Sequence, residues 1–326
     1  MILFMLAIVI GFILLVWSAD RFVEGAASTA KHLGMPTLLI GVLIVGFGTS
    51  APEMVVSAVA AIEGNPTLAL GNAIGSNIVN IALVLGVTAL VTPIVVHSKI
   101  VKKELPLLIL IIFATGYLLI DDTLTLIEGI VLLGAFFALV GWSVYTAIKS
   151  KGDSLEDELE SELKEHSMSL KAGIILVGIG LVLLIISSRI LVWGAVGVAH
   201  EFGVNDLVIG LTIVALGTSL PELAASVIAA KKGEHDIAIG NVVGSNMFNL
   251  LAVIGIAAII NPMQNIPSEV LQRDWIIMLL LSVMLLAMAY GFKPKKDGII
   301  SRAMGSVFIL CYIAYNSYLA INLGNI

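Results

Sequence analysis

Long apolar stretches, interrupted at a few places by polar and small residues, dominate the chain. A helix of roughly 20 apolar residues is long enough to cross about 30 Å of hydrocarbon. Ten such stretches occur, near residues 2–30, 36–62, 67–92, 105–120, 125–148, 170–199, 207–230, 237–260, 275–291 and 299–322. The pattern therefore predicts an all-α membrane protein with ten transmembrane helices.

The pattern also repeats within the chain. When the sequence is shifted by 169 positions, residues 41–94 align with 210–263 without a gap, and 23 of the 54 aligned positions are identical. The shift of 169 residues spans five predicted helices, an odd number, so the second half must enter the membrane from the opposite face. We expect two inverted five-helix repeats, at 1–149 and 170–326, joined by a loop at 150–169. A duplicated bundle with a purely structural role is the alternative interpretation, but duplication alone would not require carboxylates inside the membrane.

Composition supports a membrane location. The chain is 59% hydrophobic and 12% charged, with a mean hydropathy of +1.08, which a water-facing surface does not tolerate. The single cysteine, Cys311, excludes an internal disulfide and a thiolate metal cluster. The net charge of -6 mostly reflects the connecting loop, because seven of the 23 acidic residues lie between Asp153 and Glu165. We expect this loop to be a solvated cytoplasmic connector.

The basic residues indicate an orientation. With the N-terminus outside, fourteen lysine and arginine residues fall on the cytoplasmic side and only Arg273 falls outside, while Arg21 and Arg189 lie within helices. The apolar run at the N-terminus has no basic residue at its front, so we interpret it as the first membrane helix and not as a secretion signal. These features predict a multi-pass protein of the cell (inner) membrane with both termini extracytoplasmic.

Each repeat contains one segment in which the helix has to break, Gly46–Glu53 in the first and Ala215–Glu222 in the second. A proline directly precedes each glutamate, and it lacks the N–H that would bond the carbonyl four residues back. The serine three residues before each glutamate, Ser50 or Ser219, has the spacing of a capping box. We therefore expect a new half-helix to begin at each serine.

The two glutamates, Glu53 and Glu222, are expected to lie inside the membrane. A carboxylate there costs about 3 kcal/mol on insertion scales and indicates function. Two carboxylates that converge across a two-fold axis need a cation between them. Neither half offers a buried basic partner at a matching place, so the cation is predicted to be the substrate.

Hard oxygen ligands lie near both glutamates. Hydroxyl and amide side chains recur at spacings that place them along helix faces: Thr49, Ser50, Asn72, Ser76, Asn80, Asn241, Ser245 and Asn249. No thiolate or imidazole accompanies them. Such a set suits calcium or sodium and argues against zinc or copper.

Gly-Thr-Ser-x-Pro-Glu followed by Gly-Asn-x-x-Gly-Ser-Asn, present twice, resembles the alpha-repeats of the calcium/cation antiporter superfamily, specifically the sodium/calcium exchanger branch of prokaryotic type. The resemblance implies exchange by alternating access, with helices 1 and 6 sliding across a core of helices 2, 3, 7 and 8 that binds one calcium or several sodium ions. It also implies Glu53 and Glu222 as central ligands. The further ligands that it implies are Thr49, Ser50, Thr218, Ser219, Ser76, Ser245 and the carbonyls of Gly46 and Ala215.

Asn80 and Asn249 complete the candidate cation site and separate this chain from some relatives, which carry aspartate at the position of Asn249. Two carboxylates instead of three weaken the case for potassium co-transport. Proton-coupled exchangers of the superfamily resemble Gly-Asn-x-x-Glu, whereas this chain has glycine near that position, at Gly75 and Gly244. The predicted function is sodium/calcium antiport, and proton-coupled calcium or cation exchange is the alternative.

Two other classes of protein fit less well. A cation channel usually assembles rings from several subunits, whereas this chain completes its two-fold arrangement within itself. An intramembrane enzyme would need a nucleophile with a base, or a metal with imidazole ligands, and all five histidines fall at helix ends or in loops. We expect no enzymatic activity, no cofactor and no nucleic-acid partner. The expected partners are calcium and sodium ions and the lipid bilayer, with the monomer as the functional unit.

Overall fold

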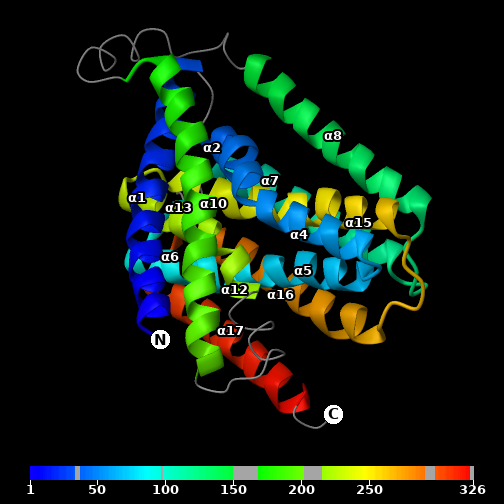
Figure 1. The fold of residues 1–326 in the computed structure, drawn as a ribbon. Coiled ribbons are helices and arrows are strands. Elements are labelled where there is room, and N and C mark those ends of the chain that lie inside the picture. The colour runs from blue at the N-terminus through cyan, green and yellow to red at the C-terminus, as the bar shows by residue number, and fades with distance from the viewer. Residues whose placement is uncertain (34–36, 97, 150–167, 202–214, 291–297, 324–326) are drawn as a thin grey trace. The chain divides into compact units, whose positions relative to one another are not determined.

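The computed structural model describes residues 1–33, 37–96, 98–149, 168–201, 215–290 and 298–323 (Figure 1). Helices make up nearly all of this part, and η marks π-helical turns. The elements of the first half are α1 (Ile2–Leu33), α2 (Thr37–Ile40), η1 (Gly41–Gly46), α3 (Phe47–Thr49), α4 (Ala51–Ile62), α5 (Pro66–Val79), η2 (Asn80–Leu85), α6 (Gly86–Val91), β1 (Ile94–Val96), α7 (Ser98–Leu118) and α8 (Leu126–Lys149). Those of the second half are α10 (Leu170–Glu201), α12 (Ala215–Thr218), α13 (Leu220–Lys231), α14 (His235–Phe248), η5 (Asn249–Val253), α15 (Ile254–Ile260), η6 (Val270–Trp275), α16 (Ile276–Ala289), β2 (Gly298–Ile300) and α17 (Arg302–Leu323).

The described chain separates into two compact units. The first unit comprises residues 1–49 and 134–244, and the second comprises 50–133 and 245–326. Both units therefore draw on both predicted repeats. Most of the predicted connecting loop, and residues 210–214 of the second copy of the repeat, lie outside the described residues.

In the first unit, helices α1 and α10 lie side by side along much of their length (Figure 1). Gly11 on α1 faces Leu191 on α10, and a Cβ atom at Gly11 would lie 2.9 Å from the Leu191 Cα. Likewise, a Cβ atom at Gly180 on α10 would lie 2.8 Å from the Phe22 Cα on α1. Because glycine has no side chain, the two backbones can touch at both places. The order of these contacts shows that α1 and α10 run antiparallel.

These two contacts are copies of each other, because a shift of 169 residues converts Gly11 into Gly180 and Phe22 into Leu191. Between them the hydroxyl oxygens of Ser18 and Ser187, also 169 residues apart, lie 3.5 Å from each other. The contacts described for α1 with α10 are thus the repeat equivalents of those for α10 with α1.

In the second unit, α5, η2 and α6 form one continuous apolar run, Pro66–Val91. Helices α16 and α17 pack beside it. The equivalent run of the second half, His235–Ile260, consists of α14, η5 and α15. These two runs are the most deeply buried of the membrane-length helices, so they belong to the core and not to the lipid-facing surface.

A short two-stranded sheet departs from the all-α prediction. Strands β1 and β2 pair antiparallel, with Ile94 opposite Ile300, and an isolated bridge joins Leu124 to Met263. Met263 is the repeat equivalent of Ile94, so equivalent residues of the two halves both take part in strand pairing. The sequence did not indicate these strands, because three β-branched residues after a helix do not distinguish a strand from a helix end.

By length and apolarity, six helical runs of the described residues could cross a membrane, or seven if the pair Gly41–Thr49 and Ala51–Ile62, bent by 46°, counts as one. The six are Ile2–Ala30, Pro66–Val91, Leu126–Tyr145, Leu170–Val198, His235–Ile260 and Val270–Ala289. Helices α7 and α17 occupy two further predicted stretches but do not qualify, and the stretch at 207–230 lies partly outside the described residues. The count of ten stays a prediction.

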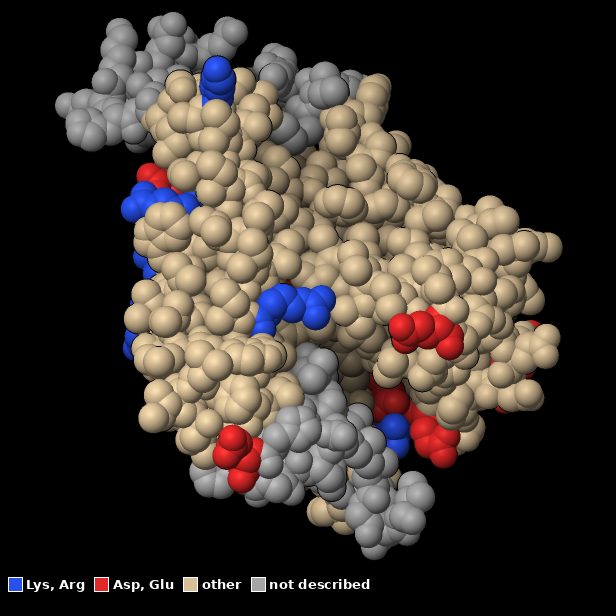
Figure 2. Space-filling model, viewed as in Figure 1, with Lys and Arg blue, Asp and Glu red and all other residues tan. Residues whose placement is uncertain are grey.

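The outer surface is strongly apolar. On the face drawn in Figure 2, lysine, arginine, aspartate and glutamate are few among uncharged residues. Large side chains such as Ile2 and Ile127 are 79% and 72% exposed. Apolar surface of this extent is unfavourable in water and indicates contact with lipid.

Candidate cation-binding site

The broken helices begin where the sequence predicts. Helix α4 starts at Ala51 after Ser50, and α13 starts at Leu220 after Ser219, each with its proline in the first turn. The predicted capping bonds, however, are wrong, because neither serine side chain makes one. The serine φ and ψ angles, -81° and 0° or -91° and 6°, are not those of the extended N-cap residue that directs its side chain to the first turn.

One carbonyl freed by the prolines has a replacement partner. In the first unit, the Ser188 hydroxyl on α10 donates a hydrogen bond of 2.9 Å to the backbone oxygen of Gly217. This oxygen is the one that the amide of residue 221 would bind if that residue were not proline. The repeat equivalent of Ser188 is Ala19, which has no hydroxyl, so the first repeat lacks this contact.

Both central glutamates are buried. Glu53 and Glu222 are each 1% exposed, and each lies in the first turn of its half-helix. Carboxylates in a first turn are favoured by the positive end of the helix dipole. Glu222 belongs to the first unit and Glu53 to the second. Their predicted convergence on one ion stays a prediction.

In the first unit, Asn241 of α14 joins the surroundings of Glu222 to Thr49. Its Oδ1 accepts a hydrogen bond of 3.0 Å from the Thr49 hydroxyl. Its Nδ2 donates to the backbone oxygen of Glu222 at 3.1 Å and to the Ser226 hydroxyl at 2.8 Å. Because Asn241 is fully buried, these three bonds satisfy an amide that water does not reach. Two of the predicted site residues, Thr49 and Glu222, are thereby connected.

The approach of Thr49 to α14 depends on a small residue. A Cβ atom at Gly244 of α14 would lie 2.9 Å from the Cα of Val42 in η1, closer than real side chains come. The backbones of η1 and α14 are therefore in direct contact at this point.

In the second unit, four asparagines form a crossed set. They are Asn77, Asn80, Asn246 and Asn249, none of them more than 1% exposed. The Asn80 Nδ2 donates to the Asn246 Oδ1 at 3.0 Å, and the Asn249 Nδ2 donates to the Asn77 Oδ1 at 3.1 Å. A shift of 169 residues converts the first bond into the second.

Both predicted ligands of this set retain an oxygen that is available to accept. Within the described residues, the Oδ1 atoms of Asn80 and Asn249 are buried and have no hydrogen-bond donor. Leaving a buried acceptor without a donor costs about 1–3 kcal/mol, and a bound cation offsets such a cost. The chemistry of these two oxygens therefore fits the cation site that the sequence predicts.

The helix changes from α-helical to π-helical geometry at Asn80 and at Asn249. Asn80 is the first residue of η2 and Asn249 is the first residue of η5, so the α-helix widens to a π-helical turn at each. Turns of this kind are rare in proteins, and those that occur are often located at functional sites.

The other predicted residues lie on the same elements. Ser76 of α5 and Ser245 of α14 are 4% and 0% exposed, Thr218 ends α12, and Gly46 ends η1. Ala215 is the first residue of α12. Ser76, Ser245 and Gly46 are thus buried, whereas Thr218 is partly buried.

Sequence reasoning missed Asn77, Asn246, Ser57 and Ser226. All four could have been found from the repeat, because Asn77 matches Asn246 and Ser57 matches Ser226. In the second unit Ser57 accepts a hydrogen bond of 3.0 Å from Asn72, just as Ser226 accepts one from Asn241. Ser188 had no such signal, because its repeat equivalent is alanine.

Known proteins of similar sequence and structure are consistent with the membrane fold and the candidate cation site described above. The family model of the sodium/calcium exchanger protein matches residues 3–145 and 172–320. CaxA of Alkalimonas amylolytica, named as a candidate antiporter, is 45% identical over 309 residues, which cover 94% of this chain and 96% of that protein. The inner membrane protein YrbG of Escherichia coli (strain K12) is 38% identical over 294 residues, which cover 88% of this chain and 89% of YrbG.

A solved structure of the sodium-calcium exchanger NCX_Mj has a TM-score of 0.82 with this chain at 30% identity, and the match covers 97% of this chain and 98% of that one. This chain belongs to the sodium/calcium exchanger protein family. It is therefore a multi-pass membrane protein from a family of cation antiporters, and the resemblance inferred from the doubled motif is confirmed.

Proposed function

We propose that the protein exchanges sodium for calcium across the cell (inner) membrane by alternating access, without a cofactor or an enzymatic step. The observation that carries this proposal is the pair Glu53 and Glu222, 169 residues apart and each 1% exposed at the start of a half-helix. Two buried carboxylates inside a membrane require cations. The names of the similar proteins, an antiporter and a sodium-calcium exchanger, support the same function.

The ligands of the transported ions are proposed to come from both repeats. Glu53 and Glu222 supply the charges, and oxygens of the neighbouring hydroxyls, amides and carbonyls complete the shell. The full set is Glu53, Glu222, Thr49, Ser50, Thr218, Ser219, Ser76, Ser245, Asn80, Asn249, Gly46 and Ala215. The crossed asparagines support it, because their free oxygens are the hard ligands that calcium and sodium prefer.

The proposed architecture is ten transmembrane helices in two inverted repeats, 1–149 and 170–326, with both termini extracytoplasmic and the monomer as the functional unit. Two observations support the inversion. The family model matches two separate stretches that nearly coincide with these halves. The α1–α10 contacts, including Ser18 beside its own repeat equivalent Ser187, are those that a two-fold axis between antiparallel helices would produce.

Sodium coupling is proposed in preference to proton coupling. Asn80 and Asn249 are neutral, and each uses its amide hydrogens to bind another asparagine, so these positions are occupied by amides that do not titrate. With two fixed negative charges, one calcium ion leaves the site neutral and three sodium ions leave it with one positive charge. Exchange in that ratio would be electrogenic, at about 2.3 kcal/mol per charge for each 100 mV of membrane potential.

The test is transport in liposomes with one gradient varied at a time. Sodium-loaded vesicles are expected to take up radioactive calcium when the exterior is free of sodium, and a potassium diffusion potential should change the rate. Uptake that ignores sodium and follows a pH gradient would contradict sodium coupling and favour the proton-coupled alternative. Passive flux without counterflow would contradict antiport altogether.

A further inference from the structure

Among the crossed asparagines of the second unit, the direction of the hydrogen bond between Asn249 and Asn77 is fixed by a backbone contact of Asn77. The Asn77 Nδ2 donates a hydrogen bond of 3.2 Å to the backbone oxygen of Asn246 and lies 3.4 Å from the Met278 sulfur. A backbone oxygen can only accept, so the Asn77 amide must present its NH2 group to it. The Asn77 Oδ1 is then turned toward Asn249, which must donate. The Asn249 Oδ1 is left as an acceptor.

The equivalent bond between Asn80 and Asn246 does not have this anchor. Within the described residues the Asn246 Nδ2 is buried and has no hydrogen-bond partner. Exchanging the oxygen and nitrogen of both amides would therefore keep one bond between them. Only Asn249 is held with its oxygen free by a chain of bonds that begins at a backbone carbonyl.

We propose that Asn77 is a positioning residue for cation binding: it does not contact the ion but holds Asn249 with its carbonyl oxygen toward the ion. This inference rests on the proposed function, since it assigns a role to a neighbour of a proposed ligand. It also explains why an amide suits position 249, because a carboxylate there could not donate to the Asn77 oxygen unless it were protonated.

The test is a double-mutant cycle of Asn77→Leu and Asn249→Ala, read as equilibrium binding of radioactive calcium to the purified protein. Each single variant is expected to weaken binding about tenfold, the loss of one ligand or hydrogen bond. If Asn77 acts only through Asn249, the double variant binds calcium with the same affinity as the single variant that binds it less tightly. The matched control is Asn72→Leu on the same helix, which bonds Ser57 and should combine with Asn249→Ala multiplicatively.

If the double variant weakens calcium binding by the product of the two single effects, the positioning role of Asn77 is overturned. If Asn77→Leu does not fold, the same cycle is run with Asn77→Ser, which is smaller and cannot reach both partners. A wild-type protein that neither binds nor transports calcium would instead overturn the proposed function, so the two failures are distinguishable.

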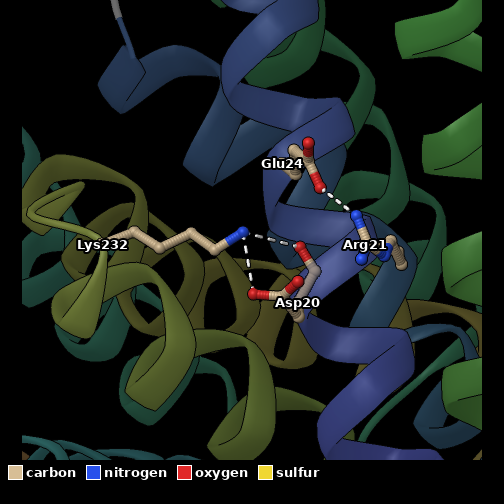
Figure 3. Close-up of polar contacts among 4 residues, drawn as sticks. All are labelled: Asp20, Arg21, Glu24 and Lys232. Carbon is tan, nitrogen blue, oxygen red and sulfur yellow. Dashed lines mark hydrogen bonds and ion pairs between the residues drawn. The ribbon is translucent and has the colours of Figure 1, made fainter.

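A second inference comes from an ion pair in the first unit. Lys232, the residue that follows α13, reaches across to α1, where its Nζ lies 2.8 Å from the Asp20 carboxylate and 3.1 Å from the Asp20 backbone oxygen (Figure 3). The pair therefore ties α1 to the helix that carries Glu222. Both side chains are about one-third exposed, at 36% and 32%, and such pairs add little net stability. The bond is weak enough to open and close repeatedly.

The residues that correspond to Asp20 and Lys232 in the repeat carry the opposite charges. Asp20 corresponds to Arg189, and Lys232 corresponds to Glu63. Both Arg189 and Glu63 are exposed.

We infer that Asp20 and Lys232 form a latch that favours one facing state of the transporter, an inference that rests on the proposed function. The resemblance assigns the sliding movement to helices 1 and 6, which carry Asp20 and Arg189.

The test compares calcium affinity from the two sides of the membrane in Lys232→Met. Loss of a latch shifts the population of facing states, so apparent affinity should rise about threefold on one side and fall on the other. Glu24→Gln is the matched control, because the Arg21–Glu24 pair of 2.7 Å lies within α1 alone (Figure 3). The exchange Asp20→Lys with Lys232→Asp should restore both affinities. Equal changes on both sides, or no rescue by the exchange, would overturn the latch.

Discussion

Helices α4 and α13 are copies of each other, but different contacts hold their ends. Both have 12 residues, a proline in the first turn and a buried glutamate. Before α13, Gly217 receives a hydrogen bond from Ser188, and after it Lys232 pairs with Asp20. Around α4 the equivalent positions are Ala19 and Glu63, which cannot make the same bonds.

The interiors of the two helices differ much less. Ser57 of α4 and Ser226 of α13 each accept a hydrogen bond from an asparagine of the following helix, Asn72 or Asn241. The residues that the repeats share thus surround the glutamates, and those that they do not share hold the helix ends. This division suggests that shared residues determine ion binding and unshared residues determine the balance between facing states.

The strongest test of the shared part is Glu53→Gln beside Glu222→Gln. Removing one of two charges that neutralise a buried calcium ion should cost about 3 kcal/mol, so transport falls at least about 100-fold in each. Calcium uptake by liposomes measures this, and size-exclusion chromatography verifies folding. Full activity in either variant would mean that the carboxylate is not a ligand, and a large difference between the two would break the equivalence of the helices.

Substitutions of Asn72 and Asn241 are expected to change stability by an intermediate amount. Asn241 makes three hydrogen bonds and is fully buried, whereas Asn72 is partly buried and donates to Ser57. Asn241→Leu should therefore lower stability by about 1–3 kcal/mol more than Asn72→Leu. Thermal unfolding with and without calcium is the measurement. An equal loss in both variants would show that the extra bonds of Asn241 contribute nothing.

The smallest effect is expected at Ser188. Ser188→Ala removes the donor to the Gly217 oxygen and should cost about 1 kcal/mol, the lower end of the range for loss of one neutral hydrogen bond. Turnover and affinity should then change by no more than about threefold to fivefold. Ala19→Ser, which adds a hydroxyl at the equivalent position, is the control. A Ser188→Ala protein without transport would place Ser188 in the ion site itself.

The two broken helices could be predicted because proline and glutamate act locally. The missing N–H at position 52 or 221 removes a hydrogen bond to the preceding turn, and the starts of α4 and α13 lie beside these prolines. The capping bonds of Ser50 and Ser219 did not follow, because they depend on backbone angles that the preceding segment sets.

The crossed asparagines could be predicted only in part. Asn80 and Asn249 were identified from spacing and from the family resemblance, but their partners Asn77 and Asn246 were not. Asn77 and Asn246 lie in the regular helices α5 and α14, one residue after Ser76 and Ser245, so a spacing of four residues did not select them. Contacts between distant segments, such as Ser188 with Gly217, leave no periodic pattern in the sequence.

The π-helical turns at Asn80 and Asn249 also bear on the history of the chain. Such a turn accommodates an extra residue within a helix, which one inserted codon can provide. Because it begins at equivalent residues in both halves, a single insertion before a duplication of the chain would account for both turns. A shorter ancestral chain of that kind would already have carried the widened turn and its asparagine.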